Sequence, residues 1–261
     1  MYQLLLRLQA TRDCAWEKQY HRRIRGRLGQ TLQRAGIDDY RETQRPPFAF
    51  SDLMPVRDDQ HPGMPLNEGD GIHLLISTPR MDIMEAIAGG LQREPELTAG
   101  SMVFETRAAK PLKTDVGAPG SEGVLTTASG IIVGVDDADT SGEHDAPEYW
   151  TERKHSVHEF KTALSGTIDR VLDHETADTD TLRPYFSDYD HLKTYASKLR
   201  VTPDHTLTVV ASKWNLHYHV RDEEHREALN ALLGTGVGRR RSYGFGMLQT
   251  RDDAETHEVS A

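Results

Sequence analysis

The alternation of apolar and polar residues along the 261-residue chain predicts short strands interleaved with amphipathic helices. An apolar run at residues 2–10 has the length of a strand. In the next segment, Trp16–Ala35, apolar residues recur every four positions, which places them on one face of a helix and the arginines on the others. Gly36 stands where a glycine commonly ends a helix.

The same two patterns continue to the end of the chain. Val, Ile and Thr are frequent in the predicted strands, and a turn containing Pro203 separates two of them. Gly234 is placed to end the last predicted helix. The further predicted strands are 48–50, 69–78, 101–107, 124–135, 191–201, 205–220 and 243–250, and the further helices are 81–91, 148–173 and 222–233.

This order of elements lacks the regular strand–helix period of a Rossmann sheet and favours an α+β fold. Two tandem ferredoxin-like domains (βαββαβ, as in RNA-recognition domains) fit both the length and the number of elements. We expect an N-terminal domain at residues 1–122 and a C-terminal domain at residues 123–261. The two halves show no literal sequence repeat, so this duplication is inferred from element order alone.

Composition narrows the class of protein. The chain has 36% hydrophobic residues and a formal net charge of −10, with no apolar run of the roughly 18 residues that a membrane span needs. Its N-terminus is charged too early for a signal peptide, and its single cysteine, Cys14, excludes an intrachain disulfide or a cysteine-based zinc cluster. These features predict a cytoplasmic protein with no membrane association.

The basic residues are unevenly used. Arginines number 23 against 8 lysines in an acidic chain, which fits either a halophilic protein or an acidic protein from a GC-rich genome. A chain of net charge −10 repels nucleic acid over most of its surface, so nucleic-acid binding would need a local basic patch. The arginines do gather in two places: Arg22, Arg23, Arg25, Arg27 and Arg34 early in the chain, and Arg239, Arg240 and Arg241 near its end.

The second cluster lies in a glycine-rich segment, GTGVGRRRSYGFG, at residues 234–246. It is not a P-loop, because no lysine follows a correctly spaced glycine pair, and it is not a dinucleotide fingerprint, because Arg239 stands at the third glycine position. Glycines allow backbone N–H groups to approach phosphate oxygens, and guanidinium groups bind phosphate bidentately. The alternative is a tight turn with solubilising arginines.

We therefore predict an RNA-binding or polyphosphate-binding site from both clusters. In concentrated salt, long-range attraction to phosphate is screened, so we expect Arg239–Arg241 to act through close bidentate contacts, where arginine is superior to lysine. The predicted RNA-binding residues are Arg22, Arg23, Arg25, Gly234, Gly236, Gly238, Arg239, Arg240, Arg241, Ser242, Gly244 and Gly246.

The ending G-x-G-x-x-R-x-x-S-x-G-F-G resembles the glycine-rich loop of the RAMP superfamily, and more narrowly that of the CRISPR-associated endoribonucleases that cut precursor CRISPR RNA within its repeats. The early strand, the arginine-bearing helix and the segment Pro46–Pro55 are similar to that family in order and spacing. The resemblance implies two ferredoxin-like domains and metal-independent cleavage, in which the ribose 2′-OH attacks the adjacent phosphate and leaves a 2′,3′-cyclic phosphate. It implies no cofactor, and as partners repeat RNA and other CRISPR effector subunits.

The chain departs from this family at the catalytic positions. The family histidine falls at Tyr40–Arg41, the lysine at Pro47 and the helix tyrosine at Gly29. Three interpretations stay open: a different proton-transfer set of His21, Tyr40 and Arg41; a protein that binds repeat RNA without cutting it; or a substitution at the catalytic position.

A more remote alternative is a metal-dependent nucleotide enzyme. His155 and His158 lie three apart on a predicted helix, and His217 and His219 lie two apart on a predicted strand, and both spacings suit metal ligands. With 13 histidines in the chain, such pairs also arise by chance.

Overall fold

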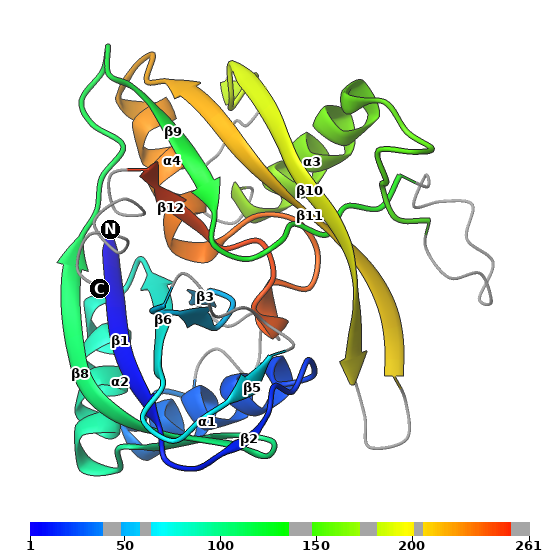
Figure 1. The fold of residues 1–261 in the computed structure, drawn as a ribbon. Coiled ribbons are helices and arrows are strands. Elements are labelled where there is room, and N and C mark those ends of the chain that lie inside the picture. Colours follow the sequence, from blue (N-terminus) through cyan, green and yellow to red (C-terminus); the bar gives the residue numbers. More distant parts are fainter. Residues whose placement is uncertain (39–47, 58–63, 136–147, 173–181, 201–205, 252–261) are drawn as a thin grey trace.

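Two antiparallel sheets, each covered by two helices, make up the computed structural model of the chain (Figure 1). The structure describes residues 1–38, 48–57, 64–135, 148–172, 182–200 and 206–251. Within these ranges, no helix combines the length and the apolar character that crossing a membrane requires.

The N-terminal half has the βαββαβ order. Its sheet runs β3-β6-β1-β8-β7, with the short β4 also paired to β6, and a separate two-stranded sheet joins β2 and β5. The bounds are β1 Tyr2–Ala10, β2 Cys14–Ala15, α1 His21–Arg34, β3 Ala49–Phe50, β4 Met54–Pro55, β5 Pro65–Leu66, β6 Gly71–Thr78, α2 Met81–Arg93, β7 Glu96–Ala99 and β8 Met102–Lys113.

The C-terminal half repeats this topology with the sheet order β10-β11-β9-β12. If only the four strands of each βαββαβ unit are counted, which are β1, β3, β6 and β8 in the first half and β9 to β12 in the second, the spatial order is second, third, first, fourth in both. Strand β7 extends the first sheet beyond β8. The predicted α+β fold of two ferredoxin-like units is therefore confirmed. The bounds are β9 Glu122–Thr127, α3 Val157–Leu172, β10 Asp188–Arg200, β11 Thr206–His219, α4 Glu223–Thr235 and β12 Leu248–Thr250. The domain boundary between residues 122 and 123 falls at the start of β9 and stays our proposal.

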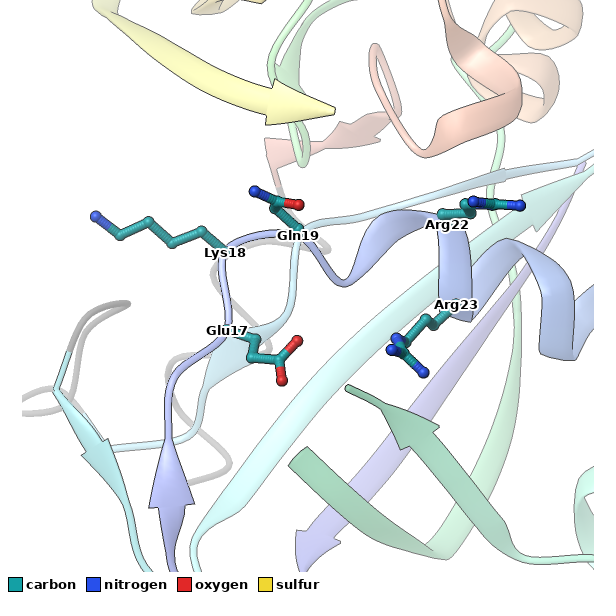
Figure 2. A pocket seen from close by; sticks show the side chains of 5 residues that line it. All are labelled: Glu17, Lys18, Gln19, Arg22 and Arg23. Atoms are coloured by element: carbon teal, nitrogen blue, oxygen red, sulfur yellow. The ribbon is translucent and has the colours of Figure 1, made fainter. Parts of the chain in front are cut away.

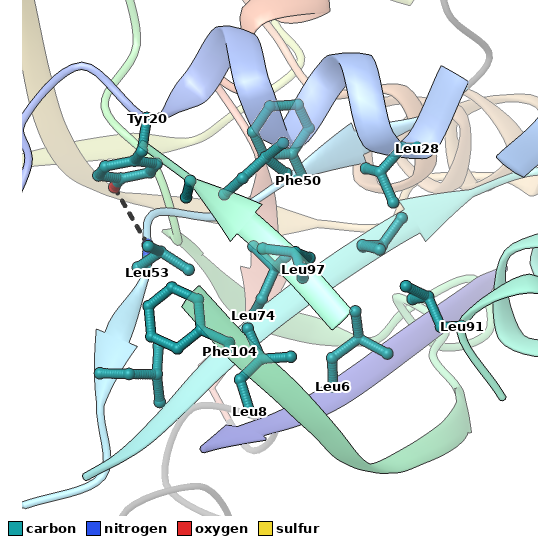
Figure 3. Packing of buried hydrophobic residues seen from close by; sticks show 14 of the residues in the cluster. Leu6, Leu8, Tyr20, Leu28, Phe50, Leu53, Leu74, Leu91, Leu97 and Phe104 are labelled. Atoms are coloured by element: carbon teal, nitrogen blue, oxygen red, sulfur yellow. Dashed lines mark hydrogen bonds between the residues drawn. The ribbon is translucent and has the colours of Figure 1, made fainter. Parts of the chain in front are cut away.

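Strand β1 is buried on both faces, which explains its nearly continuous apolar sequence. Leu6 and Leu8 pack with α1 and α2 in the core of the N-terminal half, beside Phe104 (Figure 3). Leu5 points to the opposite face, where it belongs to a small cluster with Leu75, Ala49, Ala128 and Met247. Because Ala128 and Met247 belong to the C-terminal half, this second face joins the two halves.

Two predicted helices begin later than expected. Helix α1 begins at His21 rather than Trp16, although Trp16 and Tyr20 are buried as the apolar pattern required. Helix α3 begins at Val157 rather than at residue 148, because the backbone at Trp150 is hydrogen-bonded to Val133 in an extended arrangement. In both places a buried apolar residue ahead of the helix continues the helical spacing of apolar residues, although its own backbone is not helical.

Helices α1 and α2 pack closely at Gly90, where an added Cβ would overlap Cγ2 of the buried Thr31. We predict that Gly90→Ala lowers the free energy of unfolding by about 1–3 kcal/mol, because a β-branched threonine has little room to turn aside. In a Thr31→Ala background the same change should be neutral or stabilising by up to about 1 kcal/mol, as glycine is a poor helix former.

Urea denaturation of the four proteins of this double-mutant cycle measures the effect. Gly26→Ala is the matched control, because Gly26 is also in a helix and has open space around it. Equal effects of Gly90→Ala and Gly26→Ala would contradict the packing described.

Candidate active site

The glycine-rich segment passes between the two halves and is hydrogen-bonded to the chain that follows β9. Gly246 N donates to Gly130 O at 2.9 Å, and Arg239 N donates to Ile132 O at 2.8 Å. Val237 N closes the segment on itself by donating to Gly246 O at 2.9 Å. The segment is thus a hydrogen-bonded loop anchored to the second half, with a short 3₁₀ turn at Arg241–Tyr243.

At two positions of the segment, neighbouring atoms lie so close to the backbone that only glycine fits. Gly244 and Gly246 have φ values of +80° and +73°, in the left-handed region that favours glycine. An added Cβ at Gly244 would overlap the ring of Phe50, and one at Gly246 would overlap the carbonyl oxygen of Val237. These residues are glycines because backbone and ring occupy the space of a side chain.

The predicted contact of the glycine N–H groups with phosphate is not evident from the geometry, since several of these groups already donate within the protein. Gly236 N donates to Leu232 O, where Gly236 rather than Gly234 caps α4. Gly244 N donates to Arg241 O. Gly234 and Gly238 are buried, and the carbonyl of Gly234 accepts a bond from Ser77 Oγ. RNA binding by the glycines stays a prediction.

The three consecutive arginines have different surroundings. The guanidinium group of Arg239 lies against Gly134, and Arg241 Nη1 donates to Thr235 O at 3.3 Å. Arg240 is exposed and has a left-handed backbone, with φ +61°. Ser242 is half-buried in the 3₁₀ turn. Arg240 is therefore the one of the three that is most available to a ligand.

The loop packs on the first turns of α1 (Figure 1). The ring of Phe245 stacks on that of His21, with centroids 5.0 Å apart, and the ring of Tyr20 also stacks on that of His21, with centroids 4.3 Å apart. One turn along, the guanidinium carbon of Arg25 lies 4.8 Å from the centroid of Tyr243. The predicted meeting of the arginine-bearing helix and the glycine-rich loop is confirmed.

A row of polar groups extends from His21 across the junction of the halves. His21 Nε2 lies 3.4 Å from Asp52 Oδ1, and Asp52 Oδ2 lies 3.0 Å from Lys213 Nζ. Lys213 Nζ also donates to Ala128 O at 3.4 Å. His21 and Asp52 belong to the first half, whereas Lys213 belongs to β11 of the second.

This row has a defined charge state at its centre. Burial alone would raise the pKa of Asp52, but the ammonium group of Lys213 and the hydrogen bond from His21 outweigh burial and lower that pKa to about 2. The nearby Tyr20 hydroxyl accepts a bond from Leu53 N at 3.1 Å (Figure 3), and burial together with Asp52 raises the pKa of Tyr20 far above its usual value. Asp52 is thus ionised, and Tyr20 is neutral.

Sequence reasoning found His21 but missed Asp52 and Lys213. The two residues are far apart in sequence and follow no motif spacing, although Lys213 is one of only eight lysines. Tyr40 and Arg41, the other predicted catalytic residues, lie outside the described residues. Arg22 and Arg23 are exposed on the first turn of α1.

The histidine pairs do not form a metal centre in the part of the chain that the structure describes, where no three His, Cys, Asp or Glu side chains are placed to hold an ion. His217 Nε2 lies 2.7 Å from Asp190, and His219 Nδ1 lies 3.3 Å from Glu122. Each histidine of this pair therefore has its own carboxylate partner.

No protein-family model matches the chain. It is similar to the solved structure of a RAMP protein described as binding different RNA substrates, with a TM-score of 0.72 and 18% identity over 96% of this chain and 99% of that one. It is also similar to a CRISPR-associated Cas6 protein, with a TM-score of 0.69 and 17% identity over 95% and 98%. These likenesses show the fold alone, which is that of the class of proteins built from two tandem ferredoxin-like units.

A curated relative narrows this class. The CRISPR-associated endoribonuclease Cas6 of Haloferax mediterranei is 38% identical over 254 residues, which cover 93% of this chain and 91% of that protein. The chain belongs to the Cas6 family of CRISPR-associated endoribonucleases.

The low pKa of Asp52 predicts a pH-dependent contribution to stability. Because the pKa is lower in the folded state than in the unfolded chain, the stabilisation is present above about pH 4 and is lost as the pH falls towards 2. We expect Asp52→Asn to be less stable than the parent near neutral pH, and the difference to shrink by about 2 kcal/mol between about pH 5 and pH 2.

Chemical denaturation across this pH range measures that difference. Glu85→Gln, which removes an exposed carboxylate from α2, is the control and should stay within about 0.5 kcal/mol of the parent. A gap between Asp52→Asn and the parent that does not vary with pH would refute the ion pair.

Proposed function

We propose that this protein binds CRISPR repeat RNA in the cytoplasm and cuts precursor crRNA within the repeat. Cleavage is metal-independent: the ribose 2′-OH attacks the adjacent phosphate, giving a 2′,3′-cyclic phosphate and a 5′-OH. The observation that carries the proposal is the stacking of Phe245, from the glycine-rich loop, on His21 at the start of α1. It supports a shared site for the two segments.

We assign proton transfer to His21. Asp52, which is ionised, accepts the hydrogen of Nε2 and so leaves Nδ1 of the neutral ring as a proton acceptor. A carboxylate that orients an imidazole in this way is a common arrangement for general acid–base catalysis. The ammonium group of Lys213, on the other side of Asp52, supplies positive charge for the phosphorane-like transition state.

The remaining predicted residues complete the proposal. Tyr40 and Arg41 stay proposed members of the catalytic set. Arg25 lies one turn of α1 beyond His21 and contacts Tyr243 of the loop, and this pair and the exposed Arg240 are proposed to hold the RNA, by stacking and by ionic contact.

We predict that His21→Phe lowers the single-turnover cleavage rate by about 10²–10⁴-fold, the usual contribution of a positioned acid–base group. Phenylalanine keeps a ring between Tyr20 and Phe245 but cannot transfer a proton, so RNA affinity should change little. End-labelled repeat RNA incubated with protein in EDTA gives the rate and the product ends.

His158→Ala, which removes an exposed histidine from α3, is the control and should cleave like the parent. Cleavage by His21→Phe at the parent rate would remove His21 from the mechanism and leave Tyr40 and Arg41 to be tested in the same way. RNA that is bound but intact with the parent protein would indicate a non-cleaving binder, and activity abolished by EDTA would indicate a metal enzyme.

The preference for arginine over lysine predicts a salt effect at Arg240. Since a guanidinium group binds phosphate bidentately and an ammonium group acts as a point charge, Arg240→Lys should weaken RNA binding more in high salt than in low salt. Fluorescence anisotropy at several salt concentrations measures this. Parallel salt dependences of the two proteins would show that the charge alone matters.

A further inference from the structure

A basic pocket lies beside the first turn of α1, on a different side of the helix from the catalytic row. It has a volume of about 660 Å³ and is lined by Glu17, Lys18, Gln19, Arg22 and Arg23 (Figure 2). Successive residues of a helix are about 100° apart around its axis, so Arg22 and Arg23 point away from the direction that His21 takes towards Phe245. The pocket and the His21–Asp52–Lys213 row are thus neighbouring but separate.

The acidic member of the lining is already engaged. Glu17 Oε1 accepts a hydrogen bond from Ser101 N at 2.5 Å, and its carboxylate fills the space above Gly100 in the turn between β7 and β8. This contact ties residues 17–19 to the N-terminal sheet and fixes one wall of the pocket. Figure 2 shows the Glu17 carboxylate and the Arg23 guanidinium group pointing towards one another across the pocket.

The basic residues of the lining have different surroundings. Among the described residues, no carboxylate lies within ion-pair distance of Lys18, Arg22 or Arg23. Further along the same helix, by contrast, Arg27 and Arg34 both pair with Glu94. Among the described residues, the lining side chains therefore carry three positive charges against one negative, in a chain of net charge −10.

Such a pocket fits an anion with several oxygen atoms. Two guanidinium groups and an ammonium group, which Figure 2 shows directed to different parts of the pocket, can each bind phosphate oxygens, and the amide of Gln19 can donate and accept hydrogen bonds. The volume exceeds that of a phosphate group and falls in the range of roughly 300–1,000 Å³ of pockets that enclose small ligands. A whole nucleotide unit can therefore enter with its phosphate.

We infer that this pocket is a subsite for one nucleotide of the RNA strand, whose phosphodiester is held by Arg22 and Arg23 and is not the linkage that is cut. This inference rests on the proposed function, because it takes the RNA of the neighbouring catalytic row as the ligand. The subsite contributes affinity and register, and the catalytic row contributes the rate.

The test compares the affinities of the parent protein and of its variants for repeat RNA from the CRISPR array of the same genome. In this RNA the 2′-OH at the mapped cut site is replaced by hydrogen, so that it cannot be cut. We expect the double variant Arg22→Gln/Arg23→Gln to bind about 10- to 100-fold more weakly and to lower the slope of log K against log salt by about 0.7, as the loss of one phosphate contact on a single strand requires.

Arg34→Gln is the matched control, since it removes one positive charge from the far end of the same helix. Each single variant, Arg22→Gln and Arg23→Gln, is compared with it, and thermal unfolding verifies that these exposed positions leave the fold intact. Affinities and salt slopes equal to those of Arg34→Gln would overturn the subsite.

Shortening the RNA by one nucleotide at a time from each end locates the occupant. With the parent protein, removal of one particular nucleotide should weaken binding in a single step, by about the same factor as the double substitution does. With the double variant, removal of that nucleotide should leave the affinity unchanged. A step that persists unchanged in the double variant would also overturn the subsite.

The two proposals fail separately. The parent protein could leave RNA uncut in EDTA while the loss of affinity on removal of one nucleotide depends on Arg22 and Arg23. In that case the proposed cleavage fails and the subsite stands. If the parent cuts RNA and the double variant binds it like the control, the subsite fails and the cleavage stands.

Discussion

The close passage of the glycine-rich loop against the first half of the molecule is the constraint on which the site depends. At Gly244 the backbone lies against the ring of Phe50, and at Gly246 it lies against the carbonyl of Val237, so neither position has space for a Cβ. This leaves the intervening Phe245 directed at His21. If the loop were displaced by the width of a methyl group, Phe245 would no longer stack on His21. The loop and α1, which form the proposed RNA site, would then be separated.

The Asp52–Lys213 ion pair adds a polar link across the same junction. Asp52 comes from the first half and Lys213 from β11 of the second, and both side chains are 21% exposed, so the pair is only partly screened by water. The same carboxylate contacts His21 through its other oxygen. Docking of the two halves and orientation of the imidazole therefore rest on one ionised group, and a loss of that charge would disturb both.

The sequence was sufficient for the order of the helices and of the main strands of both ferredoxin-like units, because each of these carries its own apolar period, but it missed the short strands β2, β4, β5 and β7. It misplaced the starts of α1 and α3, where Tyr20 and Trp150 are buried in non-helical backbone. It could not reveal Asp52 or Lys213 as partners, since their meeting depends on how the two sheets dock. For the glycines it suggested phosphate contact, whereas the structure shows that close packing alone requires several of them.

The arginines of α1 show why composition cannot separate structural from functional charge. In the sequence Arg22, Arg23, Arg27 and Arg34 are equivalent members of one basic cluster. In the fold, Glu94 lies opposite the middle and end of the helix and engages Arg27 and Arg34, so those charges serve the packing of α1 on α2. The arginines of the first turn face no such acid among the described residues. Their mutual repulsion is a cost that an anionic ligand relieves, and the first turn is also where the loop brings Phe245 and Tyr243. The position of one glutamate thus separates Arg27 and Arg34, which it engages, from Arg22 and Arg23, which are proposed to bind RNA.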